Sequence, residues 1–207
     1  MLELLKKNKI VAIFRGISLE DSAPAANALY HGGVRLMETT MNSENAVKII
    51  PHMRRALPGD AFVGAGTVIN LTLAREAITA GAQFIVTPNV NLEVIKYCVE
   101  NKVPVFPGAM TPTEILTAWE AGSTAVKLFP MGALGISYFK EILGPLSHIP
   151  MVLTGGIDLE NMHEFVRLGA AGFGIGGNLL RKDLVAAGRF DELQALAGKY
   201  VHAAGKL

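Results

Sequence analysis

The chain has only one cysteine, Cys98, among its 207 residues, so it cannot form a disulfide bond within itself. This composition predicts a reducing, cytoplasmic setting. The sequence has no apolar run long enough to span a bilayer, and residues 1–9 carry an early acidic side chain and no apolar core, so we expect neither an anchor nor a signal peptide. The formal net charge is +1 with both signs interspersed, which predicts no nucleic-acid or membrane partner.

Two common kinds of site are also missing from the sequence. The five histidines fall in predicted helices or outer loops and do not have the spacing of a metal site, so we expect no metal. The glycine-rich segment 172–177 lies on a predicted strand and its end, rather than on a strand–turn–helix unit. It therefore does not form the dinucleotide-binding fingerprint.

The sequence does have short apolar runs, each followed by a helical pattern. The predicted strands cover about residues 10–14, 34–40, 62–68, 83–88, 103–108, 125–129, 151–154 and 172–176. Continuous apolar strands that alternate with helices indicate a parallel sheet buried on both faces. Eight such units predict an α/β fold, a (β/α)8 TIM barrel in a single domain 1–207, preceded by a short helix over 2–8. A doubly wound open sheet is the competing architecture.

Several helix starts are predicted from residues that commonly cap helices. Ser18, Ser43 and Asp158 are expected N-caps, and Thr111 precedes a proline at the first helical position with Glu114 three residues later. These starts fix where the loops after the strands end.

Lys127 is the most informative residue of the predicted sixth strand. Alternation places Lys127 on the face opposite Val126 and Leu128, which suit contact with the helices, so the lysine is expected to point into the barrel. An inward lysine is costly unless it has a partner or a function. It is paired structurally with a carboxylate, reaches solvent from an edge strand, or is used chemically.

Other polar and small residues also fall at the strand ends, where a (β/α)8 barrel carries its active site. One mouth would collect Arg15, Glu38, Thr67, Pro88, Gly108, Lys127, Thr154, Gly155, Gly156, Gly176, Gly177 and Asn178. Burial disfavours the ammonium form of Lys127, and a neutral amine attacks a carbonyl to give a Schiff base. Glu38 is the only carboxylate placed there, so it is either the counter-ion of the lysine or the group that moves protons.

The two Gly-Gly pairs have a separate interpretation. Glycines at positions 155–156 and 176–177 allow backbone N–H groups, followed by helix N-termini, to approach an anion. The loops after strands seven and eight are the usual phosphate site of this fold. The alternative is that these glycines only make tight turns.

Particular motifs connect these residues to a known family. They are 11-VAIFRG-16, 38-ETT-40, 64-GAGTV-68, 84-FIVTP-88, 107-PG-108, 111-TPTE-114, 127-KLFP-130, 144-GP-145 and 154-TGGI-157. The chain resembles, over almost its whole length, the aldolases of 2-keto-3-deoxy-6-phosphogluconate (KDPG), 4-hydroxy-2-oxoglutarate (KHG) and 2-keto-3-deoxy-6-phosphogalactonate (KDPGal).

This resemblance implies a cofactor-free class I aldolase on a trimeric barrel. It implies Lys127 as the Schiff-base lysine and Glu38 as the general acid/base. It also implies Arg15, Thr67, Pro88 and Phe129 around pyruvate, and the four glycines of the two pairs near a phosphate. Some members have arginine where this chain has Asn42, and serine where it has Asn178. The segments 42–43 and 87–89 are similar to those of the galactonate-type members.

The expected reaction is therefore cleavage of a 2-keto-3-deoxy sugar acid, with KDPG giving pyruvate and glyceraldehyde 3-phosphate. The alternatives are KHG, which would release glyoxylate, and KDPGal. A phosphate-binding barrel isomerase is a further option, although it needs no imine-forming lysine. In a different class, the chain would be a non-catalytic barrel that binds sugar phosphates.

Overall fold

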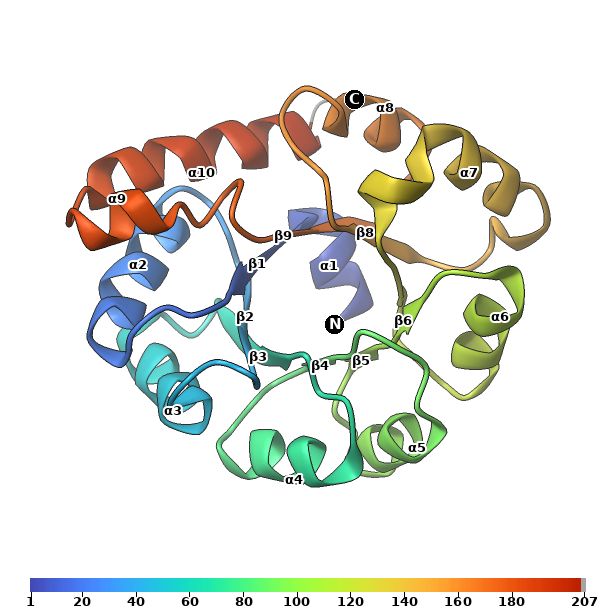
Figure 1. The fold of residues 1–207 in the computed structure, drawn as a ribbon, viewed down its shortest axis with the longest axis horizontal. Coiled ribbons are helices and arrows are strands. Elements are labelled where there is room, and N and C mark those ends of the chain that lie inside the picture. The colour runs from blue at the N-terminus through green and yellow to red at the C-terminus, as the bar shows by residue number, and fades with distance from the viewer. Residues whose placement is uncertain (206–207) are drawn as a thin grey trace.

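The computed structural model describes residues 1–205, and it confirms the predicted barrel (Figure 1). Residues 206 and 207, the end of the predicted single domain, lie outside this range. The strands are β1 (Ile10–Phe14), β2 (Leu36–Thr40), β3 (Phe62–Gly66), β4 (Ile85–Val86), β5 (Val105–Phe106), β6 (Gly108–Ala109), β7 (Val126–Leu128), β8 (Met151–Thr154) and β9 (Gly172–Ile175). They pair in parallel in the order β5-β4-β3-β2-β1-β9-β8-β7-β6.

Helices surround this sheet on its outer side, except for α1 (Leu2–Asn8), which lies across the opening of the ring (Figure 1). The outer helices are α2 (Leu19–His31), α3 (Ala46–Ala56), α4 (Leu71–Thr79), α5 (Leu92–Glu100), α6 (Pro112–Glu120), α7 (Met131–Leu146), α8 (Met162–Arg167), α9 (Lys182–Ala186) and α10 (Phe190–Gly205). Among residues 1–205, no helix is long and apolar enough to cross a membrane.

The predicted fifth strand is divided into two short segments. β5 pairs with β4 through Val105 and Ile85, and β6 pairs with β7 through Gly108 and Lys127. Pro107 lies between β5 and β6 and has no N–H for a ladder hydrogen bond. Residues 105–109 thus take the place of the fifth strand in the ring. Their first part, β5, pairs with β4, and their last part, β6, pairs with β7, so they connect the two ends of the sheet.

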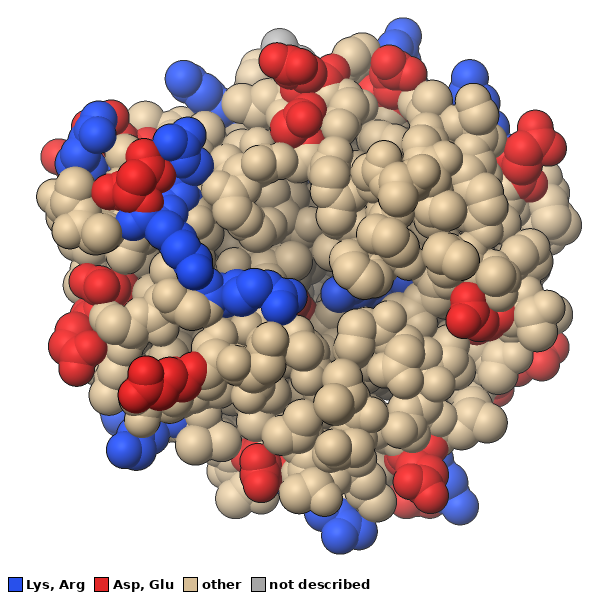
Figure 2. Space-filling view, viewed as in Figure 1, with Lys and Arg blue, Asp and Glu red and all other residues tan. Residues whose placement is uncertain are grey.

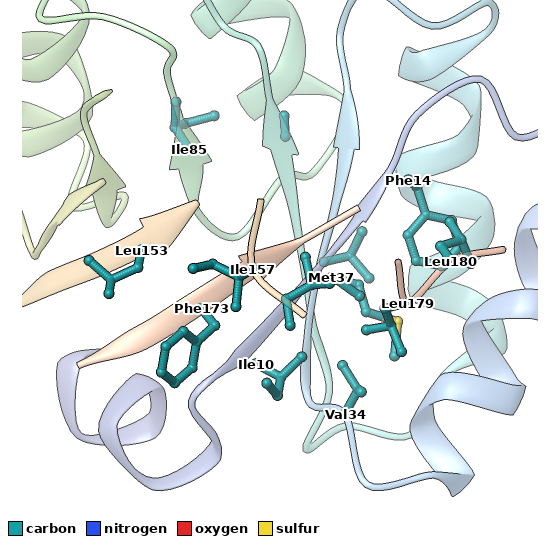
Figure 3. Packing of buried hydrophobic residues seen from close by; sticks show 14 of the residues in the cluster. Ile10, Phe14, Val34, Met37, Ile85, Leu153, Ile157, Phe173, Leu179 and Leu180 are labelled. Atoms are coloured by element: carbon teal, nitrogen blue, oxygen red, sulfur yellow. The ribbon is translucent and has the colours of Figure 1, made fainter. Parts of the chain in front are cut away.

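Alternate residues of the strands belong to two separate apolar clusters. Val126 and Leu128 of β7 lie in the large cluster between the strands and the helices, part of which is shown in Figure 3. Ala125 lies in the smaller cluster inside the barrel, and it has the same parity as Lys127. The predicted inward direction of Lys127 is therefore confirmed.

Helix α1 closes one end of the barrel. Its residue Leu5 is fully buried and belongs to the inner cluster with Val11, Leu36 and Phe84, which lie at or near the starts of their strands. Figure 1 shows α1 behind the ring of strands. Since α1 fills the N-terminal end, the C-terminal ends of the strands are left to form a mouth.

Two of the four predicted caps are confirmed. Ser18 accepts a hydrogen bond from the N–H of Asp21, and Thr111 and Glu114 form a full capping box on α6. Two caps were wrong. Helix α3 begins after Asn45 in a left-handed conformation, and α8 begins after Asn161, although Ser43 and Asp158 were the expected caps.

The side chains of those two residues have other partners. Asp158 Oδ1 accepts hydrogen bonds from the N–H groups of Glu160 and Asn161 in the turn before α8. Ser43 binds groups at the ends of β1 and β2, as described below. Helix α7 begins at Met131, earlier than the predicted residue 137, because the chain is already helical before a break at Gly135, where φ is 76°.

Candidate active site

A cavity of about 410 Å³ opens at the C-terminal ends of the strands. Figure 2 shows the hollow near the centre of this face, with lysine and arginine side chains on two sides of it. The cavity is lined by Ile13, Arg15, Thr67, Pro88, Lys127, Phe129, Thr154, Gly155, Gly156, Ile157, Gly174, Ile175, Gly176, Gly177 and Asn178. Every residue predicted for the mouth except Glu38 and Gly108 is in this set, so the barrel brings them to one place.

Lys127 lies in the inner wall of the cavity. Lys127 is only 7% exposed. Within residues 1–205, no carboxylate oxygen lies within 4.0 Å of its Nζ atom. Burial lowers the pKa of Lys127, the nearby Arg15 charge lowers it further, and Glu38 opposes this change in part. The structure thus favours the neutral, nucleophilic amine at a lower pH than for an exposed lysine.

Glu38 lies deeper than Lys127, at the centre of β2. Its residue is 2% exposed, and it lines a second cavity of about 10 Å³ together with Lys127 and Thr154. Burial raises the pKa of Glu38, while the charges of Lys127 and Arg15 act in the opposite direction. Its Oε2 atom has no hydrogen-bond partner among the described residues. A buried carboxylate without partners is costly, and this is typical of a group kept for proton transfer.

The arrangement of Glu38 and Lys127 bears on whether they form a structural ion pair. They line the same small cavity, but no carboxylate oxygen of Glu38 lies within 4.0 Å of the Lys127 Nζ atom. The direct ion pair considered from the sequence is therefore not present in the structure. They influence each other through space, since each opposes the effect of burial on the other's pKa. The cavity that both residues line has room for little more than one water molecule.

Three further predicted residues form the walls. Lys127 Nζ lies 4.9 Å from the ring centroid of Phe129, close enough for the ring face to stabilise a cation formed at that nitrogen. Thr67 has a φ of 57°, which is rare for a β-branched residue and indicates backbone strain at the cavity wall. Pro88 completes this side, and its backbone packs so closely on Gly108 that a side chain there would clash.

The two glycine pairs form the outer part of the cavity. Gly155 and Gly156 have φ values of 86° and 71°, which side chains rarely allow. Within residues 1–205, the N–H groups of Gly156, Gly177 and Asn178 donate no hydrogen bond to the protein, and they are free for a ligand. The helices expected to start there begin only at Met162 and Lys182, so backbone N–H groups, rather than helix ends, are the donors that an anion could use here.

Asn178 joins the two glycine loops. Its Nδ2 atom donates a hydrogen bond of 2.9 Å to the carbonyl oxygen of Ile157, which directly follows the first pair. Gly156 in turn packs backbone to backbone against Gly132, where an added methyl group would lie 2.5 Å from the Gly132 Cα atom. The loops are therefore held in place before any ligand binds.

Sequence reasoning missed two supports of the site. Ser43 Oγ accepts a hydrogen bond of 2.9 Å from the N–H of Gly16 and lies 2.7 Å from Thr40 Oγ1, so it connects the ends of the strands that carry Arg15 and Glu38. Gly66 lies against the Glu38 carboxylate, and any side chain there would overlap it. The small residues of the strand over 62–68 were the available signal for Gly66. Ser43 looked like an ordinary helix cap.

A metal site is not evident in the part of the chain that the structure describes. No group of three or more His, Cys, Asp and Glu side chains lies in a suitable arrangement among residues 1–205. Around Lys127 the structure places a buried amine, a buried carboxylate and a rim of backbone N–H groups without protein partners.

Comparison with known proteins finds relatives over almost the whole chain. The KDPG and KHG aldolase family model matches residues 1–196. A 2-dehydro-3-deoxy-phosphogluconate aldolase of Treponema pallidum is 35% identical, covering 98% of this chain and 97% of its own. A 2-dehydro-3-deoxy-6-phosphogalactonate aldolase of Escherichia coli is 36% identical, covering 84% and 86%.

Solved structures agree with the family match. A KDPG aldolase of Legionella pneumophila, which holds pyruvate captured at low pH as a covalent carbinolamine intermediate, has a TM-score of 0.89 at 26% identity. That comparison covers 95% of this chain and 96% of the other. By its fold and its inward lysine, the chain belongs to the broad class of (β/α)8-barrel proteins with a lysine inside the barrel. Within it, the chain belongs to the KDPG and KHG aldolase family.

Proposed function

We propose that the protein is a class I aldolase that cleaves 2-dehydro-3-deoxy-6-phosphogluconate into pyruvate and glyceraldehyde 3-phosphate. The observation that carries the proposal is a buried Lys127 without a direct ion pair, which shares a cavity with a buried Glu38. Membership of the aldolase family supports the reaction type. The carbinolamine in the Legionella relative supports an amine–carbonyl adduct as its first step.

In the first half of the reaction, neutral Lys127 attacks the C2 carbonyl of the substrate. The carbinolamine takes up a proton and loses water to give a protonated imine, whose positive charge lies near the face of Phe129. That proton is released again when water later hydrolyses the imine. Because this imine accepts electrons, the bond between C3 and C4 is weakened. Arg15 lines the same cavity and suits the substrate's C1 carboxylate.

In the second half, the carboxylate of Glu38 accepts the proton of the C4 hydroxyl as the C3–C4 bond breaks. C4 becomes the aldehyde carbon of the departing product, and the bond electrons remain on C3 as an enamine. Protonated Glu38 then returns a proton to C3, and water hydrolyses the imine to release pyruvate and free Lys127. Atoms and charges balance without any cofactor. The pKa of Glu38, raised by burial, suits it to both transfers.

The outer end of the cavity supports a phosphorylated substrate. Three backbone N–H groups, those of Gly156, Gly177 and Asn178, are free there, and such groups bind phosphate oxygens well. The second candidate is the galactonate epimer, favoured by the relative of that specificity at 36% identity. KHG, which ends in a carboxylate, would use the same inner residues but fewer of the outer N–H groups.

Reductive trapping tests the proposal. Borohydride added with pyruvate should add a reduced adduct to the peptide that contains Lys127, and Lys127→Met should abolish it. Lys140→Met, which changes an exposed lysine on α7, is the matched control and should be trapped like the wild type. Trapping at another lysine, or none in the wild type, would refute the Schiff-base mechanism. Turnover of KDPG, KDPGal and KHG then ranks the substrates.

We also infer that the protein assembles as a homotrimer, as the family resemblance implies. Ile69, Leu92 and Met110 are large apolar residues that are 50%, 55% and 44% exposed. They follow or flank neighbouring strands, and the Asn91 side chain connects the first two loops through the Ile69 carbonyl oxygen. Burying such residues between copies would remove apolar surface from water. Light scattering coupled to size exclusion measures the oligomer mass.

A further inference from the structure

The surface next to the glycine loops carries a second cation that family motifs do not mark. A methyl group added at Gly16 would lie 3.0 Å from the Nζ atom of Lys182. The ammonium group of Lys182 therefore lies over the backbone that directly follows Arg15. Figure 2 shows a continuous band of basic side chains that runs from the side of α9 to the edge of the hollow.

Lys182 reaches this position from the loop that forms the outer cavity. That loop begins with Gly176 and Gly177, which line the cavity, and it is fixed by Leu179 and Leu180 in the main core cluster. The N–H groups of both leucines donate to the Gly176 carbonyl oxygen, at 2.9 and 2.8 Å. Since the backbone before Lys182 is anchored in this way, its side chain starts from a defined point beside the mouth.

Charge pairing leaves this lysine free. Its neighbour Arg181 is bound by both oxygens of Asp183, at 2.9 and 2.8 Å, so these two charges compensate each other. Within residues 1–205, neither Lys182 nor Arg15 has a carboxylate oxygen within 4.0 Å. An ammonium group without a counter-ion at this rim attracts anions, and a dianion bound beside Lys182 would compensate its charge.

On the basis of the proposed function, we propose that Lys182 is a specificity-determining residue for the distal phosphate of the substrate. The free N–H groups of the glycine loops bind the phosphate oxygens, and Lys182 supplies a positive charge from the Gly16 side of the rim. A dianionic phosphate gains more from this charge than a single carboxylate does. Lys182 thus favours phosphorylated sugar acids over KHG, although it takes no part in the bond cleavage.

Kinetics on substrates with and without the phosphate test this role. Lys182→Met should raise KM for the phosphorylated sugar acid about five- to tenfold and leave kcat within about twofold, since one partly exposed charge contact is lost. Lys182→Arg should restore most of the loss. The rate of pyruvate trapping at Lys127 should not change, because pyruvate has no distal anion. Lys140→Met is the control for loss of an exposed lysine.

Two results would overturn the role of Lys182. One is an unchanged KM for the phosphorylated substrate in Lys182→Met. The other is an equal loss with the unphosphorylated substrate or in pyruvate trapping, since it would indicate a general structural effect. Binding of glycerol 3-phosphate, followed by phosphorus NMR, needs no turnover. A wild type that cleaved no sugar acid would refute the proposed function. Whether Lys182→Met binds glycerol 3-phosphate more weakly than the wild type would still decide the role of the lysine.

Discussion

A single methyl group at Gly66 should separate the stability of this barrel from its chemistry. In Gly66→Ala, the added carbon would lie 2.7 Å from Glu38 Cδ and 3.1 Å from Oε2, and closer still to Oε1. The glutamate cannot remain there and must rotate away. Its surroundings are closed, since the residue is 2% exposed and the cavity beside it measures only about 10 Å³.

The size of the effect follows from these contacts. Extra volume in a packed interior costs about 1–3 kcal/mol of the free energy of unfolding. For a chain of this length each kcal/mol lowers Tm by about 2–4 °C, so we expect a decrease of about 2–12 °C. A catalytic group displaced by about 1 Å loses about 100-fold in rate, and we expect kcat to fall by about that factor. Lys127 is untouched, so pyruvate trapping should persist.

Gly64→Ala is the matched control, two residues earlier on the same face of β3. Its methyl group would lie 2.6 Å from two ring atoms of the buried Phe84, so it overpacks the interior chiefly against this ring, whereas the methyl group at Gly66 meets Glu38 first. We expect a similar decrease in Tm, with kcat of the folded protein near the wild-type value. If Gly66→Ala kept the kcat of Gly64→Ala, Glu38 would not be the proton-transfer group. Thermal melts and steady-state kinetics on both variants provide the comparison.

Two further predictions concern the charges of the site. Lys127→Met should raise the free energy of unfolding at pH 7 by about 1–2 kcal/mol, because burial penalises the ammonium. The pKa of Lys127 is lower in the folded protein than in the unfolded chain, where it is about 10.4. The gain in the free energy of unfolding should therefore shrink as the pH rises toward about 10.4, and thermal melts at several pH values will measure this change. Arg15→Met should move the acidic limb of kcat/KM to higher pH, because Arg15 lowers the pKa of both Lys127 and Glu38 and the reaction needs both deprotonated. A limb that stayed in place or moved to lower pH would contradict this, and Lys140→Met is the control.

The features that the sequence predicted well depend on short-range pattern and on the regularity of the barrel. The alternation around Lys127 was sufficient to place it inside, because neighbouring side chains of a strand point to opposite faces. The strand ends were sufficient to gather Arg15, Thr67 and the glycine pairs, because parallel strands all end at the same side. Family motifs then assigned roles that spacing alone left open.

The features that the sequence did not predict depend on contacts between distant segments. Ser43 has the sequence context of a helix cap, yet its hydroxyl instead binds Gly16, 27 residues away. Pro107 divides a strand that reads as continuous. Lys182 stands in a polar stretch after the last strand, and only the folded structure places its ammonium group on Gly16. Local propensity contains no information about such approaches.

Under the proposed function, two parts of the site recognise the two ends of the substrate by different means. The inner part, around Lys127 and Glu38, is buried, closely packed and supported by Gly66, so changes there alter the chemistry. The outer part consists of free backbone N–H groups and the exposed cation Lys182, so changes there should alter the affinity for the distal group. Because the two parts share few contacts, their substitutions should be nearly additive in free energy. One inner mechanism can therefore serve substrates that differ at the distal end, and the sequence of the outer loops would decide among them.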